Sequence, residues 1–313
     1  MSETRRPRSR RRRPLRAAVG LLVLMAVAGY FVVQRASNGG GAPYCTAAVA
    51  AAAGAGSDGA RQSYEMTTEQ AANAATIAAV GIAKGLPDRA VTIALATAMQ
   101  ESSLRNIDHG DRDSLGLFQQ RPSQGWGTPE QIMDPVYSAG IFYDHLVDVP
   151  GYSRLPLTVA AQKVQRSGYP QAYAKHEPDA TVLTAAFGEG GTLSCSGPAP
   201  APGDPRTVRA EVARAFGEGA LAGEPGGEAG ADGASVLLAR GEGPGAVRRG
   251  RAMAHWAVAR AQELGIARVS YEGQGWIGGQ ARGQWRPGAA GGGTGTAGAA
   301  EAPGNEIRLL VAR

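Results

Sequence analysis

The sequence predicts an α+β protein with an N-terminal transmembrane helix, a mostly helical domain with a small β-hairpin, and a small α+β domain at the end. Three features predict this fold class. A charge-free apolar run lies near the start, apolar residues at helical spacing fill the middle, and short strand-like segments flank one helix near the end. The 46 glycines and 19 prolines among 313 residues indicate that linkers and tails take up much of the chain.

The N-terminal segment combines a basic tail with an apolar run. Residues 1–16 carry eight arginines and one glutamate, so the tail is +7 and the remainder of this +5 chain is −2. Residues 17–33 contain no charge and would extend about 25 Å as a helix, nearly the thickness of a bilayer core. Arginines before the run place that end in the cytoplasm. We expect a single-pass plasma-membrane anchor, and a signal peptide that is cleaved to release a secreted protein is the alternative.

The charge distribution also bears on partners and cofactors. A slightly acidic body offers no broad basic surface for phosphates, so we expect no nucleic-acid partner. The segment "DHGDRD", residues 108–113, lacks the spacing of a calcium loop, and two cysteines alone cannot form a zinc site. The sequence therefore predicts neither a metal nor a cofactor.

The two cysteines, Cys45 and Cys195, bracket one segment of an exported chain. Because disulfides persist in oxidising compartments, we expect them to be bonded. The chain-entropy model gives roughly 4 to 5 kcal/mol of stabilisation for such a loop. Two unpaired buried thiols are the alternative.

Composition shifts divide the chain into parts. Residues 34–43 are predicted to be a flexible linker and residues 196–205 a proline-rich one. They delimit a first domain at 44–195 and an accessory module at 206–313. A stretch near 287–304 is too rich in glycine and alanine to pack, and we expect it to be disordered.

Capping residues and spacing predict the elements in order. In the first domain, a helix starts at Thr67 or Thr68 and stops at Gly85, and the next runs from Asp88 to near Ser102. Further helices are expected at 129–147, 156–167 and 170–177, with "LGLFQQR" (115–121) as a strand or hairpin arm. In the second domain, strands are expected at 234–240, 267–273 and 306–313 and a helix at 251–264.

Glu101 is the first candidate for chemistry. It lies in the last turn of a helix, where the helix dipole disfavours a carboxylate. Burial among Met99, Leu104, Phe118 and Trp126 would raise its pKa further, toward the range in which a glutamic acid protonates a leaving-group oxygen. A surface glutamate at a frayed helix end is the alternative.

A combination of motifs favours the catalytic interpretation. Glu101 and Ser102 form a Glu-Ser pair within "MQESSLRN", and "GLFQ" (116–119) follows with "GDR" (110–112) before it. Over residues 64–175 these motifs resemble soluble lytic transglycosylases and goose-type lysozymes of the lysozyme-like superfamily. That resemblance implies that Glu101 is the catalytic acid, that Ser102 supports it, and that Gln119, with Gln120 beside it, lines a sugar groove.

The chain also departs from those families. Lytic transglycosylases carry an "AYNAG" motif, and the nearest counterpart here is "AAQKVQRSG" (160–168), which has no asparagine. Gln162 or Gln165 would take that polar role. Goose-type enzymes have an aspartate two residues after the glutamine of the turn, where this chain has Arg121.

Asp111 bears on the type of reaction. A second carboxylate about 6.5 to 9.5 Å from the acid leaves room for water and predicts hydrolysis with inversion. If Asp111 points away, Glu101 would act alone and the substrate would close an anhydro sugar, as in the transglycosylases that this chain resembles. The sequence leaves both open.

Aromatic residues supply candidate sugar contacts. Trp126, in a glycine-flanked loop, and Tyr169, between glycine and proline, are expected to contact substrate. The stretch from His255 to Trp276 resembles a C-terminal module of secreted actinobacterial wall proteins. Tyr271, Trp276 and Trp285 would form its binding surface.

Together these features predict cleavage of the β-1,4 bond between N-acetylmuramic acid and N-acetylglucosamine in peptidoglycan. The expected partners are the glycan strands and, through residues 17–33, the plasma membrane. The rival hypothesis is a catalytically inactive wall-binding or scaffold protein that retains the groove.

Overall fold

The structure is a computed structural model, and it describes residues 43–49, 62–168, 171–223, 229–230, 233–280, 283–287 and 306–313. The predicted tail, anchor and first linker lie outside these ranges, as does almost all of the glycine-rich stretch near 287–304. Among the described residues, no helix has both the length and the apolar character needed to cross a membrane.

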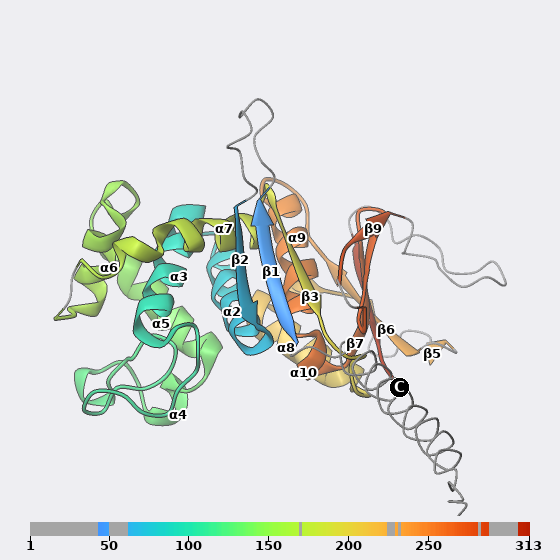
Figure 1. The fold of residues 1–313 in the computed structure, drawn as a ribbon, viewed down its shortest axis with the longest axis horizontal. Coiled ribbons are helices and arrows are strands. Elements are labelled where there is room, and N and C mark those ends of the chain that lie inside the picture. The colour runs from blue at the N-terminus through green and yellow to red at the C-terminus, as the bar shows by residue number, and fades with distance from the viewer. Residues whose placement is uncertain are drawn as a thin grey trace, which may run out of the picture. The chain divides into compact units, whose positions relative to one another are not determined.

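Pro43–Arg313 forms one compact α+β unit, drawn in Figure 1. The described elements, in chain order, are β1 Tyr44–Val49, β2 Ser63–Thr67, α2 Thr68–Ala83, α3 Asp88–Ser102, η1 Pro122–Gln124, α4 Pro129–Ile132, α5 Pro135–Val147, η2 Tyr152–Arg154, α6 Leu157–Gln165, η3 Ala174–His176, α7 Glu177–Phe187, β3 Gly191–Ser196, α8 Pro205–Phe216, η4 Glu218–Ala220, β4 Leu221–Ala222, β5 Ala229–Gly230, β6 Gly233–Ala239, α9 Ala246–Ala259, α10 Ala261–Leu264, β7 Ile266–Tyr271, β8 Gln274–Ile277, β9 Arg286–Pro287 and β10 Glu306–Val311.

The first part of the unit corresponds to the predicted domain at residues 44–195, and helices α2 and α3 form its centre. A capping box starts α2, since the Thr67 hydroxyl accepts from the Gln70 N–H and the Gln70 side chain accepts from the Thr67 N–H. Gly85, with a φ of +70°, follows its end. Most residues of both helices are buried, so each has neighbours on several sides. The starts and ends predicted for both helices are confirmed.

The first sheet has strand order β2-β1-β3 within the described residues, and both pairs are antiparallel. Cys45 of β1 lies opposite Cys195 of β3, and the two are joined by a disulfide. The predicted disulfide is therefore present. It ties the start of the first part to its end.

Other elements of the first part differ from the prediction. The helix expected at 129–147 is two helices, because Pro135 restricts Asp134 to an extended conformation, from which its side chain caps α5. The prediction of a helix at 170–177 is wrong, since α7 starts only at Glu177. The segment 115–121 is a turn with a single bridge, Leu115 to Gln120, rather than a strand.

The second part corresponds to the predicted module at residues 206–313. It is an antiparallel sheet covered by α9. Its described strands follow the order β4-β6-β10-β7-β8-β9, with β5 also paired to β6. Buried residues alternate along β10, where Ile307, Leu309 and Val311 face the core. The three predicted strands are found. The single helix predicted at 251–264 is two helices, α9, which begins earlier at Ala246 and ends at Ala259, and the short α10 after Arg260.

Helix α9 lies between the two sheets (Figure 1) and packs against β3, β7 and α2. Hydrogen bonds cross the same boundary: the indole N–H of Trp276 donates to the Cys195 carbonyl (3.3 Å) and that of Trp285 to the Leu193 carbonyl (2.8 Å). Residues on either side of the 196–205 segment thus share one packed interior.

Candidate functional site

The last turn of α3 positions Glu101, and the backbone after it is strained. Ser103 and Leu104 adopt left-handed conformations, with φ values of 55° and 59°, which non-glycine residues rarely adopt. Helix α2 holds this end, because Gln70 donates to the Ser103 carbonyl (2.9 Å) and Asn73 to the Leu104 carbonyl (2.8 Å). Strain that the surroundings impose is a common property of functional sites.

Glu101 is half-buried, and its carboxyl has two side-chain partners. The Tyr173 hydroxyl donates to its Oε1 at 2.5 Å, and the Gln165 side chain also hydrogen-bonds to it. Burial raises the pKa of Glu101 above its usual value, and the hydrogen bonds from Tyr173 and Gln165 act in the opposite direction. Burial and the adjacent carboxyl raise the pKa of Tyr173, so its phenol stays protonated and remains a donor.

The 115–120 turn is fastened to the same place. Ser102 is buried, and its hydroxyl is hydrogen-bonded to the Ala98 carbonyl (3.1 Å) and the Leu117 carbonyl (2.8 Å). The Gln165 Nε2 donates to the Phe118 carbonyl (2.7 Å). Ser102 therefore has a positioning role in the structure. Gln165 links Glu101, the turn and α6.

Gln119 lies in this turn with a φ of 48°, and its Nε2 donates to the carbonyls of His109 and Gly116, both at 3.3 Å. A Cβ on Gly110 would overlap the Gln119 side chain, so this contact requires glycine there. Gln120 is different: it is 1% exposed, and its Nε2 donates to the Ser138 carbonyl (3.1 Å). Gln120 therefore lies in the interior, where a sugar would not reach it.

Asp111 is exposed, and among the described residues its side chain makes no hydrogen bond or ion pair. Asp113, two residues on, is bound instead by Ser123, whose N–H donates to it (2.9 Å), and by Arg121 (2.7 Å), and these bonds hold the pKa of Asp113 well below its usual range. The arginine that departs from the goose-type pattern thus fixes this loop.

The remaining sequence candidates are more dispersed. Trp126 packs on His145 of α5, with ring centroids 4.4 Å apart. The Nε2 of Gln162 donates to the Ser167 carbonyl (2.8 Å). Tyr169 lies outside the described residues. Of the two glutamines weighed for the missing asparagine, Gln165 is the one that contacts Glu101.

Sequence patterns do not single out Tyr173, and its contact with Glu101 is visible only in the structure. It is fully buried and lies directly before η3, which leads into α7. Its sequence signal is the "AYAKHE" stretch (172–177), which follows the counterpart of the transglycosylase motif, but only the fold brings Tyr173 to α3.

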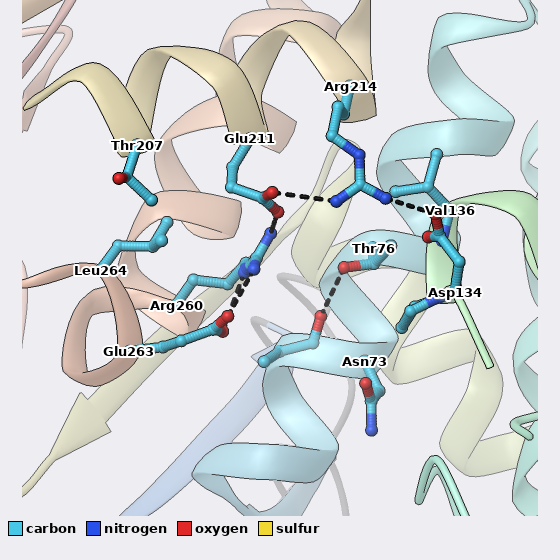
Figure 2. A pocket seen from close by; sticks show the side chains of 12 residues that line it. Asn73, Thr76, Asp134, Val136, Thr207, Glu211, Arg214, Arg260, Glu263 and Leu264 are labelled. Carbon is cyan, nitrogen blue, oxygen red and sulfur yellow. Dashed lines mark hydrogen bonds and ion pairs between the residues drawn. The ribbon is translucent and has the colours of Figure 1, made fainter. Parts of the chain in front are cut away.

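A cleft of about 390 Å³ lies elsewhere, between α2, the start of α5, α8 and α10. Figure 2 shows its charged wall: Arg214 bonds Asp134 (2.5 Å) and Glu211 (2.9 Å), and Arg260 bonds Glu211 (2.7 Å) and Glu263 (2.6 Å). Because these charges satisfy one another, we interpret the cleft as a junction between the two parts of the chain.

The predicted aromatic surface of the second part is only partly exposed. Trp276 is 2% exposed and Tyr271 is 7% exposed, so both belong to the core, whereas Trp285 is half-buried. His255 is also buried, and its Nδ1 donates to the Ala186 carbonyl. Burial lowers the pKa of His255 to about 4, so the ring is neutral near pH 7.

Comparison of the chain with protein-family models and with curated proteins finds no match.

Proposed function

We propose that the protein cleaves the β-1,4 bond between N-acetylmuramic acid and N-acetylglucosamine in peptidoglycan, with Glu101 as the general acid. One observation carries the proposal: a half-buried glutamate with a raised pKa, held by Tyr173 and Gln165 at a strained helix end. A glycosidic oxygen leaves only when it is protonated, and a neutral glutamic acid is a suitable donor near pH 7.

The two hydrogen-bond donors fit the second half of the step. When Glu101 gives up its proton, the carboxylate that forms is stabilised by the Tyr173 hydroxyl and the Gln165 side chain. Burial thus favours the acid before transfer, and the donors favour the carboxylate after it. The predicted anchor at 17–33 would hold this chemistry at the outer face of the plasma membrane.

The exposed position of Asp111 leaves it free to contact solvent or substrate. If Asp111 activates water, Asp111→Asn will abolish cleavage that yields reducing ends. If Glu101 acts alone, Asp111→Asn will retain cleavage and the products will carry anhydro ends. Mass spectrometry of the released fragments distinguishes these two reactions.

The test of the proposal uses the full-length chain in a detergent without sugar groups and purified peptidoglycan as substrate. Glu101→Gln keeps the shape of the side chain but removes the proton donor, so fragment release should fall by about 10² to 10⁴-fold. Glu69→Gln, in the exposed first turn of α2, is the matched control and should cleave normally. Equal release by Glu101→Gln and the wild type would eliminate the proposal, and binding without cleavage by the wild type would favour the scaffold hypothesis.

A further inference from the structure

A second cavity lies in the C-terminal part, where β3 meets α9 and the β7–β8 turn. Its volume is about 200 Å³, below the roughly 300 to 1,000 Å³ of sites that hold drug-sized ligands, so it suits a single ring. Its lining residues are Gly191, Thr192, Arg251, His255, Tyr271, Glu272, Gln274 and Trp285. Helix α7, whose 11 residues span about 16 Å, separates β3 from the end of α3 that carries Glu101.

One wall of the cavity is aromatic and fixed. The Trp285 indole N–H donates to the Leu193 carbonyl (2.8 Å), and its ring lies edge-on to His255 with centroids 5.5 Å apart. The carbonyl of Ala186 can only accept, so Nδ1 of His255 carries the proton and Nε2 is left as an acceptor. These bonds set the wall before any ligand arrives.

The lining also contains a carboxylate, Glu272, on a strained turn. Tyr271 pairs with Gln274, and between them Glu272 and Gly273 have φ values of 48° and 70°, as in a type I′ hairpin turn. Asparagine, aspartate or glycine normally occupies the position of Glu272, so glutamate has a conformational cost there. A strained residue beside a cavity points to a role for its side chain.

Glu272 is surrounded by charge but retains capacity for hydrogen bonds. Arg240 and Arg251 lie 3.5 and 3.7 Å from its oxygens, farther than an ordinary N–H to oxygen bond. The Tyr271 hydroxyl also lies beside it, and donates to the Val247 carbonyl (3.3 Å). Thr192 and Gln274 are exposed, and within the described part of the chain their side chains have no hydrogen-bond partner.

These groups have the chemistry of a carbohydrate site. A sugar hydroxyl can donate to Glu272 and accept from Arg251, while the apolar face of the ring packs on Trp285. Among the lining residues, the charges of Arg251 and Glu272 offset each other, so the cavity favours a neutral ligand. We propose that this cavity binds one sugar ring of a glycan, at a site separate from Glu101. The inference goes beyond the proposed cleavage and does not depend on it.

The test follows the indole N–H signals of the four tryptophans by NMR in the full-length chain, held in a detergent without sugar groups, with N-acetylglucosamine as the probe. Trp285→Phe assigns the signal of Trp285. We expect this signal to shift with saturation, while the signals of the buried Trp256 and Trp276 stay in place. A Trp285 signal that does not move with the sugar would overturn the proposal, as would one that moves only with D-alanyl-D-alanine, a zwitterionic peptide.

Two variants complete the test. Glu272→Asn suits the turn and should preserve folding, but its shorter neutral side chain should weaken binding about tenfold or more. Glu242→Asn, at an exposed glutamate outside the cavity, is the control and should bind normally. Equal binding by Glu272→Asn and the wild type would contradict the proposal. A failure of the wild type to release fragments in the peptidoglycan assay, in contrast, would contradict the proposed cleavage by Glu101 and not the proposed sugar site.

Discussion

At the scale of single residues, the Glu101 carboxyl is subject to two opposing effects. Burial favours its neutral form, whereas Tyr173 and Gln165 donate hydrogen bonds that favour its charged form. A general acid needs both forms within one catalytic cycle. The hydrogen-bond donors around Glu101 are therefore as important for its proposed role as its burial is.

Tyr173→Phe removes one donor and leaves the ring in place. The pKa of Glu101 should rise, so the alkaline limb of the pH–rate profile, where the acid loses its proton, should move to higher pH. The kcat should fall about tenfold or more, because a hydrogen bond to the developing carboxylate is lost. Tyr44→Phe, at an exposed tyrosine, should change neither. A profile that keeps its position with Tyr173→Phe would show that the hydroxyl does not act on Glu101.

The same carboxyl group links stability to pH. A folded-state pKa above the unfolded value means that stability is complete below the unfolded pKa and declines as pH rises through the folded pKa. Glu101→Gln removes this decline. Its melting temperature relative to the wild type should therefore increase from pH 4 to pH 7, as measured by calorimetry, and a difference independent of pH would contradict the pKa shift.

At the scale of elements, the site is where α3, α6 and the 115–120 turn meet. The Ser102 hydroxyl and the Gln165 Nε2 each donate to a carbonyl of the turn, at 2.8 and 2.7 Å. The turn thus depends on side chains from two helices.

Gln165 and Gln162 lie on the same helix and provide a matched pair of variants. Gln165→Ala should lower kcat about tenfold and shift the alkaline limb upward, because it removes a donor to Glu101 and the link to Phe118. Gln162→Ala should leave the pH profile unchanged, since the Nε2 of Gln162 donates to Ser167. Identical profiles for the two variants would remove Gln165 from the site.

The sequence predicts the elements whose signals are local. Thr67 and Gly85 delimit α2, and the spacing of apolar residues indicates α3, so the position of Glu101 at a helix end follows from the sequence. The partners of Glu101 do not, because Tyr173 lies 72 residues away and reaches it only through packing of the chain before α7 against α3. The short, glycine-bounded segment "LGLFQQR" suggested a strand or hairpin arm, yet Gly116, with a φ of +74°, and Gln119 bend it into a turn.

At the scale of the whole molecule, the second part packs against the first along α2, α7 and β3. Arg248 pairs with Asp88 (2.7 Å) and donates to the Leu86 carbonyl (3.0 Å), and the Arg214–Asp134 pair joins α8 to the start of α5. Such contacts depend on the folded surfaces of both parts, which amino-acid composition does not predict. Composition predicted only the proline-rich segment between the two parts.

The disulfide acts on the same scale, because it links residues 150 positions apart in the chain. Reduction, or Cys45→Ser with Cys195→Ser, should lower the free energy of unfolding by roughly 4 to 5 kcal/mol in the chain-entropy model. Denaturant titration of the oxidised and reduced protein measures this difference. Equal midpoints would mean that the bond does not stabilise the fold.

We expect the Glu101 carboxyl to hold its proton to higher pH than an ordinary glutamate, and NMR titration of its side-chain carboxyl carbon measures this property. Glutamate labelled with ¹³C in the full-length chain gives the signal, and Glu101→Gln assigns it. The raised pKa of Glu101 predicts a midpoint above 4.5, the ordinary value for a glutamate carboxyl. A midpoint at or below 4.5 would contradict it.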